Sequence, residues 1–218
     1  ELTGATGRTH DGGGGSDTIM GDLYAVADNH FFDLAAGTGQ LGSGALEIYT
    51  NFENYYSNFS NSGGDVSGTS GANKMHGGGL SNVFTGLGGN DSLSGNGGND
   101  TLYGGDDNDS LYGGSGNDHL YGGAGTNSLY SGTGIDRLYG GTGINYHYGG
   151  SDSLLVYGGS GTDIVYGGTT VERDHIALGA GNDTVIVGTV VANIDDDYYG
   201  GTGIDHINWD GQSQGGVF

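Results

Sequence analysis

The chain has 218 residues, among them 53 Gly and neither Pro nor Cys, and its 26 acidic residues against 4 Lys and Arg give a formal net charge of −22. Such a charge repels phosphate backbones and anionic lipid, which argues against partners that are nucleic acids or acidic membranes. The missing Cys excludes disulfide scaffolds, thiolate metal sites and thiol catalysis. No stretch approaches the roughly 20 apolar residues of a transmembrane helix.

The acidic residues are almost all aspartates, with 22 Asp against 4 Glu. Charged disordered tails are instead rich in Glu, Lys and Pro. Short carboxylates among glycines are typical of turns that hold a ligand. Cations are therefore the expected partners of this chain.

Residues 1–67 are predicted to be an irregular N-terminal part. One nine-residue motif stands alone at residues 12–20, with Asp17 at its sixth position. The following segment, to residue 67, is rich in aromatic side chains, and it is either a set of degenerate coils or a packed insertion. It is too short and too poor in polar groups to be an enzyme domain. The aromatic residues are Phe31, Phe32, Phe52, Tyr55, Tyr56 and Phe59.

Residues 68–166 form eleven contiguous blocks of nine residues with the pattern G-G-x-G-x-D-x-U-x, as in residues 95–103 and 113–121. Positions one to six combine glycines that can take a positive φ with an acceptor-rich Asn-Asp pair, which is turn chemistry. Positions seven to nine form a short strand whose middle side chain points inward. The inward row is interrupted only by His147 and otherwise contains Leu93, Leu102, Leu111, Leu120, Leu129, Leu138, Val156 and Val165.

Two turns and two strands close one coil of about 18 residues, and coils stacked about 4.8 Å apart make two parallel sheets. The sequence therefore predicts an all-β fold, a parallel β-roll (β-solenoid). The absence of Pro agrees with strands that donate hydrogen bonds to neighbours on both sides. Because the core is one residue wide, the rod needs a further source of stability.

The nine-residue pattern resembles the calcium-binding nonapeptide repeat of the RTX (repeats-in-toxin) family. The resemblance implies a β-roll that binds several Ca²⁺ ions. It also implies export by bacterial type I machinery, with folding outside the cell, and hence an extracellular or cell-surface location.

The position-six aspartates are the expected metal ligands. Because successive turns alternate between two sides of the roll, each Asp should meet the one two repeats further on, so that Asp91 pairs with Asp109 and Asp118 pairs with both Asp100 and Asp136. Calcium takes six to eight oxygen ligands from carboxylates and carbonyls. The candidate ligands are Asp17, Asp91, Asp100, Asp109, Asp118, Asp136, Asp163, Asp183 and Asp205, with the position-five residues Asn90, Asn99, Asn108 and Asn117.

Calcium binding should fade along the roll, because position six is not always Asp. It is Asn73, Asn82, Asn127 and Asn145 in four repeats and Leu154 in a fifth. Asn keeps an oxygen but loses the charge, so full sites are expected at about residues 86 to 141, with weak or vacant sites beyond. Stacked carboxylates repel one another without a cation, so the fold should depend on calcium.

Residues 167–218 are predicted to be divergent coils with a C-terminal cap. Isolated motifs occur at residues 178–186 and 200–208, and the β-branched run 184–194 suggests a capping hairpin. The ends of a solenoid have to differ from its middle.

Position nine is Tyr in eight consecutive repeats. Because successive strands belong to opposite sheets, these tyrosines form two rows, one on each face of the roll. Two interpretations of the rows remain open. Stacked rings support neighbouring strands, or the rows are exposed apolar faces suited to lateral packing, adhesion or sugar stacking. One row is Tyr103, Tyr121, Tyr139 and Tyr157, and the other is Tyr112, Tyr130, Tyr148 and Tyr166.

No catalytic residues are expected. The chain has no H-E-x-x-H motif, and the G-x-S-x-G match at residues 211–215 is followed by only three residues, too few for the helix that a nucleophile elbow needs. His147 is interpreted as a defect in the core, because it has no companions for a zinc site.

The sequence thus favours a secreted calcium-binding structural or adhesive protein, not an enzyme, that self-associates or contacts the cell surface or extracellular matrix through its tyrosine faces and forms a surface layer, sheath or filament. The alternative is the C-terminal secretion and folding module of a larger exported exoenzyme or adhesin. A third possibility is an ice-binding RTX solenoid, although position three is too irregular for an ice lattice.

Overall fold

The computed structural model describes the backbone of residues 9–11, 18–21, 30–33, 38–40, 47–50, 54–57, 64–167, 173–187, 196–209 and 212–217, and side chains within 64–167, 173–187 and 196–208. All regular secondary structure in these ranges consists of β-strands. No helix in the described part of the chain could span a membrane.

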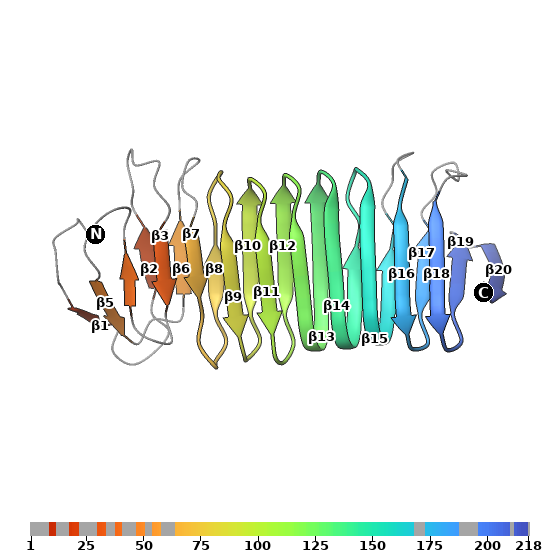
Figure 1. The fold of residues 1–218 in the computed structure, drawn as a ribbon, viewed down its shortest axis with the longest axis horizontal. Coiled ribbons are helices and arrows are strands. Elements are labelled where there is room, and N and C mark those ends of the chain that lie inside the picture. The colour runs from red at the N-terminus through yellow and green to blue at the C-terminus, as the bar shows by residue number, and fades with distance from the viewer. Residues whose placement is uncertain are drawn as a thin grey trace.

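The strands follow one another along a rod (Figure 1). They are β1 (Thr9–Asp11), β2 (Thr18–Gly21), β3 (His30–Asp33), β4 (Thr38–Gln40), β5 (Glu47–Thr50), β6 (Asn54–Ser57), β7 (Gly64–Ser67), β8 (Lys74–His76), β9 (Val83–Leu87), β10 (Ser92–Gly97), β11 (Thr101–Gly105), β12 (Ser110–Ser115), β13 (His119–Thr133), β14 (Asp136–Tyr148), β15 (Leu154–Tyr166), β16 (His175–Ala180), β17 (Thr184–Val187), β18 (Asp197–Thr202), β19 (His206–Trp209) and β20 (Gln212–Val217).

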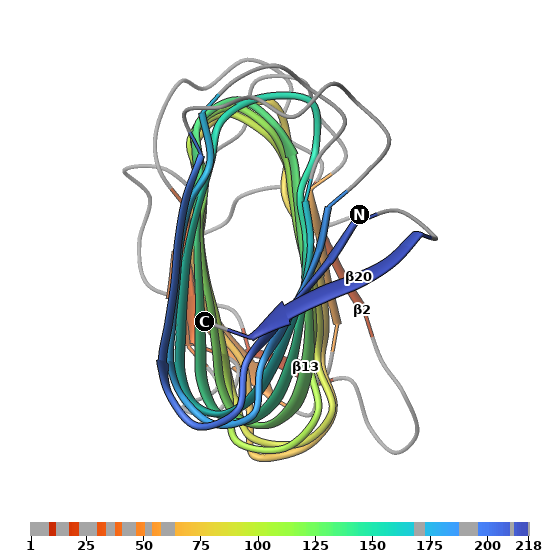
Figure 2. The ribbon, with the colours of Figure 1, turned by 90° about the vertical axis from the view of Figure 1, so that its right-hand side faces the viewer.

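The repeat region is a parallel β-roll, as the nine-residue period predicts. Each strand pairs in parallel with the strand one coil further on, so that Leu93 lies beside Leu111 and Leu102 beside Leu120. β13, β14 and β15 are longer because each continues through a turn into the opposite sheet. Seen along the axis, successive coils superimpose as a flattened ring (Figure 2).

The core is the predicted single row of inward side chains. All eight predicted aliphatic members are fully buried, and Val66, Met75 and Phe84 extend the row towards the N-terminus. Ile176 and Val185 extend it towards the C-terminus. His147 is also fully buried, between Leu129 and Val165 in the register.

The turns lie on two sides of the roll, which we call the lower and upper turns after their places in Figure 1. The lower turns connect, for example, β9 to β10, and their sixth positions include Asp91 and Asp109. The upper turns connect, for example, β10 to β11, and their sixth positions include Asp100 and Asp118. Two separate series of aspartates therefore run along the rod.

The coil lengthens towards the C-terminus. The step between paired coils is 20 residues where Leu155 pairs with His175, and it is 22 residues where His175 pairs with Asp197. The extra residues fall between β15 and β16 and between β17 and β18, on the upper side, while the two sheets keep their parallel register.

The expectation of a capping hairpin at residues 184–194 is wrong for its first part. β17 pairs in parallel with both β15 and β19, because Val185 occupies the next inward position of the core row. The antiparallel pair at this end is instead β19 with β20. The remainder of the predicted hairpin, from residue 188, lies outside the described residues.

Parallel pairing also reaches into the N-terminal part. β6 pairs in parallel with β2 and β8, and β7 pairs in parallel with β3 and β9. The strand β4 differs, because it pairs in antiparallel fashion with both β3 and β5. Elements of both interpretations, coils and an insertion, are therefore found before residue 67.

Candidate metal centre

The position-six side chains form a buried hydrogen-bonded ladder in each series of turns. The backbone N–H of Asp118 donates to Oδ1 of Asp136 at 2.8 Å, and that of Asp100 donates to Oδ1 of Asp118 at 2.8 Å. On the lower side the N–H of Asp91 donates to Oδ1 of Asp109, also at 2.8 Å. The aspartates expected to meet across two repeats are therefore neighbours.

The ladder continues beyond the contiguous repeats on the lower side. The N–H of Asp163 donates to Oδ1 of Asp183 at 2.9 Å, and that of Asp183 donates to Oδ1 of Asp205 at 3.1 Å. These three carboxylates are at most 1% exposed. Their placement thus follows the same rule, although the coil is longer here.

The second carboxylate oxygen is the unusual feature of this ladder. In seven of these residues Oδ2 is buried and has no hydrogen-bond partner among the described residues. Buried polar atoms are nearly always hydrogen-bonded, and an uncompensated buried carboxylate is especially unfavourable. Oxygens of this kind are suited to binding a cation. The residues are Asp91, Asp100, Asp109, Asp118, Asp163, Asp183 and Asp205.

A glycine at position one leaves space beside six of these seven oxygens, whereas Leu178 stands at this position before Asp183. A Cβ on Gly113 would lie 2.5 Å from Oδ2 of Asp118 and 2.6 Å from the carbonyl oxygen of Ser131 on the next coil. A carboxylate and a carbonyl oxygen therefore converge where any larger residue would put its side chain. Gly104 repeats the arrangement with Oδ2 of Asp109 and the carbonyl oxygen of Gly122.

The donor set fits calcium. Ca²⁺ prefers carboxylate and carbonyl oxygens and tolerates irregular geometry. In the described part of the chain no three His, Asp or Glu side chains surround one point. A cation between two coils would therefore be held by Asp Oδ2 and by backbone carbonyls, which supply the further ligands.

Burial and mutual repulsion keep these carboxylates ready to exchange a proton for a cation. Burial raises the pKa of Asp91 to about 7, the backbone N–H of Asn73 opposes the rise, and the charges of Asp109 and Asp107 add to it. Burial likewise raises the pKa of Asp100 and of Asp109 to about 6. In the folded, metal-free roll these three aspartates therefore take up protons between about pH 6 and 7.

Asp136 departs from its neighbours. Burial raises its pKa to about 7, but the Ser131 side chain donates a hydrogen bond to this carboxylate. Ser131 is itself only 2% exposed and stands at position one, where the other ten repeats of the block have Gly. A hydroxyl thus occupies the space that is open beside Asp118.

Side chains, in place of a backbone N–H, contact Oδ1 of Asp163, while its Oδ2 has no partner among the described residues. Its Oδ1 accepts from Nδ2 of Asn145 at 3.0 Å and contacts Nε2 of His147 at 3.2 Å. Asn127 in turn donates through Nδ2 to Oδ1 of Asn145 at 3.1 Å. His147, interpreted from the sequence as a core defect, is thus a ladder contact.

Two ladder residues were missed by the sequence pattern. On the upper side the N–H of Leu154 donates to Oδ1 of Asp174 at 2.9 Å, and that of Asp174 donates to Oδ1 of Asp196 at 3.0 Å. Tyr198 donates its hydroxyl to Oδ2 of Asp196 at 3.1 Å. The sequence pattern missed them because these turns lack the glycine motif. The signal that could have identified them is an Asp two residues before an inward side chain, as in Asp174 and Ile176.

The position-five asparagines form a second, exposed series on the outer rim of the turns. Oδ1 of Asn99 accepts the N–H of Asn117 at 2.8 Å, and Oδ1 of Asn117 accepts that of Ile135 at 2.8 Å. Asn90 and Asn108 accept in the same way from the next coil. Metal ligation by these four residues stays a prediction. Asp17 lies outside the described residues.

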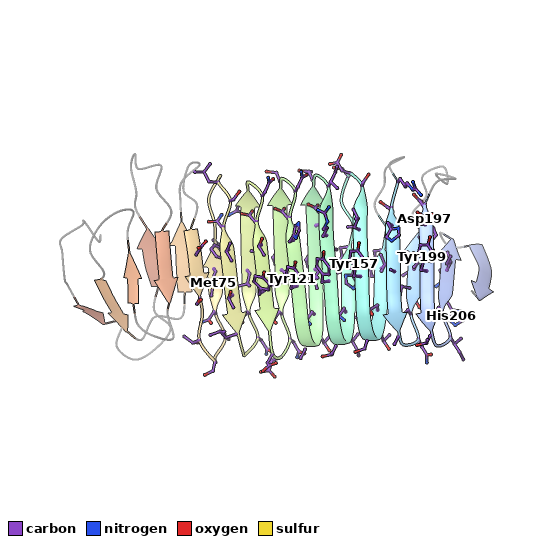
Figure 3. The ribbon with its side chains drawn as sticks, viewed as in Figure 1. Met75, Tyr121, Tyr157, Asp197, Tyr199 and His206 are labelled. Atoms are coloured by element: carbon purple, nitrogen blue, oxygen red, sulfur yellow. The ribbon has the colours of Figure 1, made fainter. Side chains whose placement is uncertain are left out.

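The two tyrosine rows run along opposite faces of the roll. Tyr121 and Tyr139 stack with ring centroids 4.5 Å apart and planes inclined by 4°. Figure 3 shows Tyr121 and Tyr157 in line along one sheet. Because neighbouring rings cover each other's faces, the inner rings offer edges and hydroxyls to solvent, not the flat faces on which sugars stack.

The comparison with known families agrees with this geometry. The family profile that describes 4 copies of the RTX calcium-binding nonapeptide repeat matches this chain at residues 67–102, 76–111, 94–129, 103–138 and 172–189. A search of curated proteins finds no match. The matched segments contain five of the seven aspartates that have an unpaired oxygen, and Asp163 and Asp205 lie outside them. The repeat region of this chain therefore belongs to the RTX calcium-binding nonapeptide repeat family.

Proposed function

We propose that the chain is a secreted, calcium-dependent structural or adhesive protein, in which bound ions turn a weakly stable roll into a stiff rod. The observation that carries this proposal is the row of buried Oδ2 atoms without partners, since it makes the folded state depend on an added cation. Binding energy for the ion then becomes folding energy. The ligands proposed are the position-six aspartates with an unpaired Oδ2.

The outer surface supports a role in assembly. Tyr103, Tyr112 and Tyr157 are each 37–41% exposed, and the two rows place aromatic edges on both faces of the rod. Calcium neutralises part of the charge of −22, so that rods approach one another more easily once it is bound. Lateral packing of rods into a layer, sheath or filament is the proposed outcome.

Export from a bacterial cell by type I machinery is part of the proposal, and its support is membership of the RTX repeat family. A chain that stays unfolded in a calcium-poor cytosol and folds outside would suit such a route. The alternative role, a secretion and folding module of a larger exoenzyme or adhesin, rests on the same repeats.

Circular dichroism with calcium and with chelator tests the first part of the proposal. At pH 8 the β-sheet signal should appear only with calcium, and a signal that is equally strong in chelator at this pH would contradict calcium-dependent folding. Electron microscopy and light scattering then test assembly, for which monomers at all calcium concentrations would favour the module over the structural role. Serine in place of Tyr121 and Tyr139 should reduce assembly and leave calcium binding unchanged. The control Tyr146→Ser, outside the rows, should change neither assembly nor calcium binding.

A further inference from the structure

The tyrosine rows hold phenol rings at a spacing that is unusually regular for side chains on a protein surface. In the first row the centroid distances are 4.7, 4.5 and 5.1 Å, and in the second they are 4.7, 4.5 and 4.8 Å. The planes of successive rings differ by 4–14°. Successive rings of a row therefore lie nearly parallel and in stacking contact.

Among the described side chains, the tyrosine rings are the oxidisable groups that a dissolved oxidant reaches first. The chain has 15 Tyr but no Cys, two Met and one Trp, so thiols do not compete for an oxidant. Met75 is fully buried, while Tyr103, Tyr112 and Tyr157, at ends of the rows, are more than a third exposed. Tyrosine is thus the principal oxidisable group on the described surface.

We propose that the two rows are sites of oxidative cross-linking, in which a peroxide and a haem peroxidase join tyrosines on adjacent coils as dityrosine. Each of two phenols gives one electron and one proton, and the peroxide leaves as two waters. The two phenoxyl radicals couple through their ortho carbons, and the ortho protons move to the phenol oxygens as the rings regain aromaticity. The balance is two tyrosines and one peroxide to one dityrosine and two waters.

The pairs predicted to react first are Tyr121 with Tyr139 and Tyr130 with Tyr148. They have the shortest centroid distance, 4.5 Å, and plane angles of 4° and 5°. Burial raises the pKa of the Tyr121 phenol, and the phenols of Tyr139 and Tyr103 raise it further. The Tyr121 phenol therefore stays protonated at neutral pH, in line with the balance above.

Such a bond would tie adjacent coils together independently of calcium. Each one closes a loop exactly one coil long across the parallel register, as between Tyr121 and Tyr139. A covalent loop restricts the unfolded chain, which raises the stability of the folded state. A cross-linked rod would then keep its fold after the ions that assembled it are removed. This inference requires only the calcium-loaded roll, not assembly into a layer or filament.

The test treats dilute, calcium-saturated full-length protein with hydrogen peroxide and a haem peroxidase. Monomers are isolated on a denaturing gel and digested, and peptide pairs that have lost two hydrogen atoms are mapped by mass spectrometry. The expected result is dityrosine fluorescence in the monomer band with links between residues 121 and 139 and between 130 and 148. Dityrosine found only in dimers, or links between tyrosines that are not coil neighbours in one row, would overturn the proposal.

Two controls separate row geometry from general oxidation. Tyr139→Phe should remove the 121–139 link and leave the 130–148 link on the other face, whereas Tyr146→Phe should leave both. Chelation before oxidation should abolish both links, and persistence of the same links in unfolded protein would count against the proposal. Cross-linked monomers should also need more chelator than untreated ones to lose their β-sheet signal.

Discussion

The backbone N–H of Asp118 donates to Oδ1 of Asp136 at 2.8 Å, while Oδ2 of Asp118 is buried and has no partner in the described residues. The two oxygens of one carboxylate thus have different tasks. Oδ1 joins its coil to the preceding one through the backbone, and Oδ2 is left beside a glycine and a carbonyl oxygen, where a cation would satisfy it in its ionised form. Coil stacking and metal binding are therefore coupled at the same residue.

The first prediction concerns the charge of this residue. Asp118→Asn keeps the Oδ1 acceptor but removes the negative charge, so calcium binding should weaken about tenfold or more. Asp106→Asn is the matched control, because it removes the same charge from an exposed position of a turn. Isothermal titration calorimetry compares the two, and equal loss of affinity in both variants would indicate general electrostatics instead of direct ligation.

The second prediction concerns the space beside Oδ2. In Gly113→Ala the new Cβ would lie 2.5 Å from Oδ2 of Asp118, so the calcium-loaded fold should lose about 1–3 kcal/mol in its free energy of unfolding. Gly88→Ala is the control, since the nearest atoms to its Cβ lie 3.8 Å away. Denaturant unfolding at saturating calcium should separate the variants. Similar stabilities would mean that the space beside Oδ2 is not needed.

The third prediction concerns pH in the absence of metal. The pKa of Asp91 and of Asp136 is raised to about 7 in the folded state, and that of Asp100 and of Asp109 to about 6, whereas an unfolded Asp titrates near 3.9. Between these values the folded state binds more protons than the unfolded one. The stability of the metal-free roll is therefore greatest below about pH 4 and falls as pH rises through 6 to 7.

Calcium should reverse this dependence, because ligation requires the ionised carboxylate. Circular dichroism in calcium-free buffer should show more β-sheet at pH 4 than at pH 8, and the calcium affinity should rise from pH 5 to pH 8. A metal-free protein that is better folded at pH 8 would contradict the proton ladder.

Much of this architecture was predictable because the information is local. A period of nine with an apolar eighth position sets the inward row from Leu93 to Val165, and the position-six Asp sets the ladder spacing. Asp174 and Asp196 were missed because the coil grows to 20 and then 22 residues, and only the parallel register of the sheets reveals their alignment. The different roles of Oδ1 and Oδ2 could not be predicted, because a residue pattern does not distinguish the two oxygens of one carboxylate.

The contacts of single residues that depart from the repeat pattern could not be predicted from the sequence either. Ser131 and His147 read as irregularities in the pattern, yet each contacts the carboxylate of a ladder aspartate. Which donor reaches which oxygen depends on side-chain placement between coils, and the sequence contains no signal for it.

The fourth prediction restores a calcium site on the lower side. Asn145→Asp combined with His147→Leu gives the repeat 140–148 an Asp at position six and an inward Leu, as in its neighbours. The Asn145 amide and the His147 ring, which now lie 3.0 and 3.2 Å from Oδ1 of Asp163, are removed, and a second carboxylate is placed beside it. The double variant should therefore bind about one additional calcium ion. His147→Leu alone should bind the wild-type number, because it repairs the core row between Leu129 and Val165 without adding charge. Calorimetric stoichiometry decides the matter, and an unchanged number of ions in the double variant would show that a carboxylate at position 145 does not complete a calcium site.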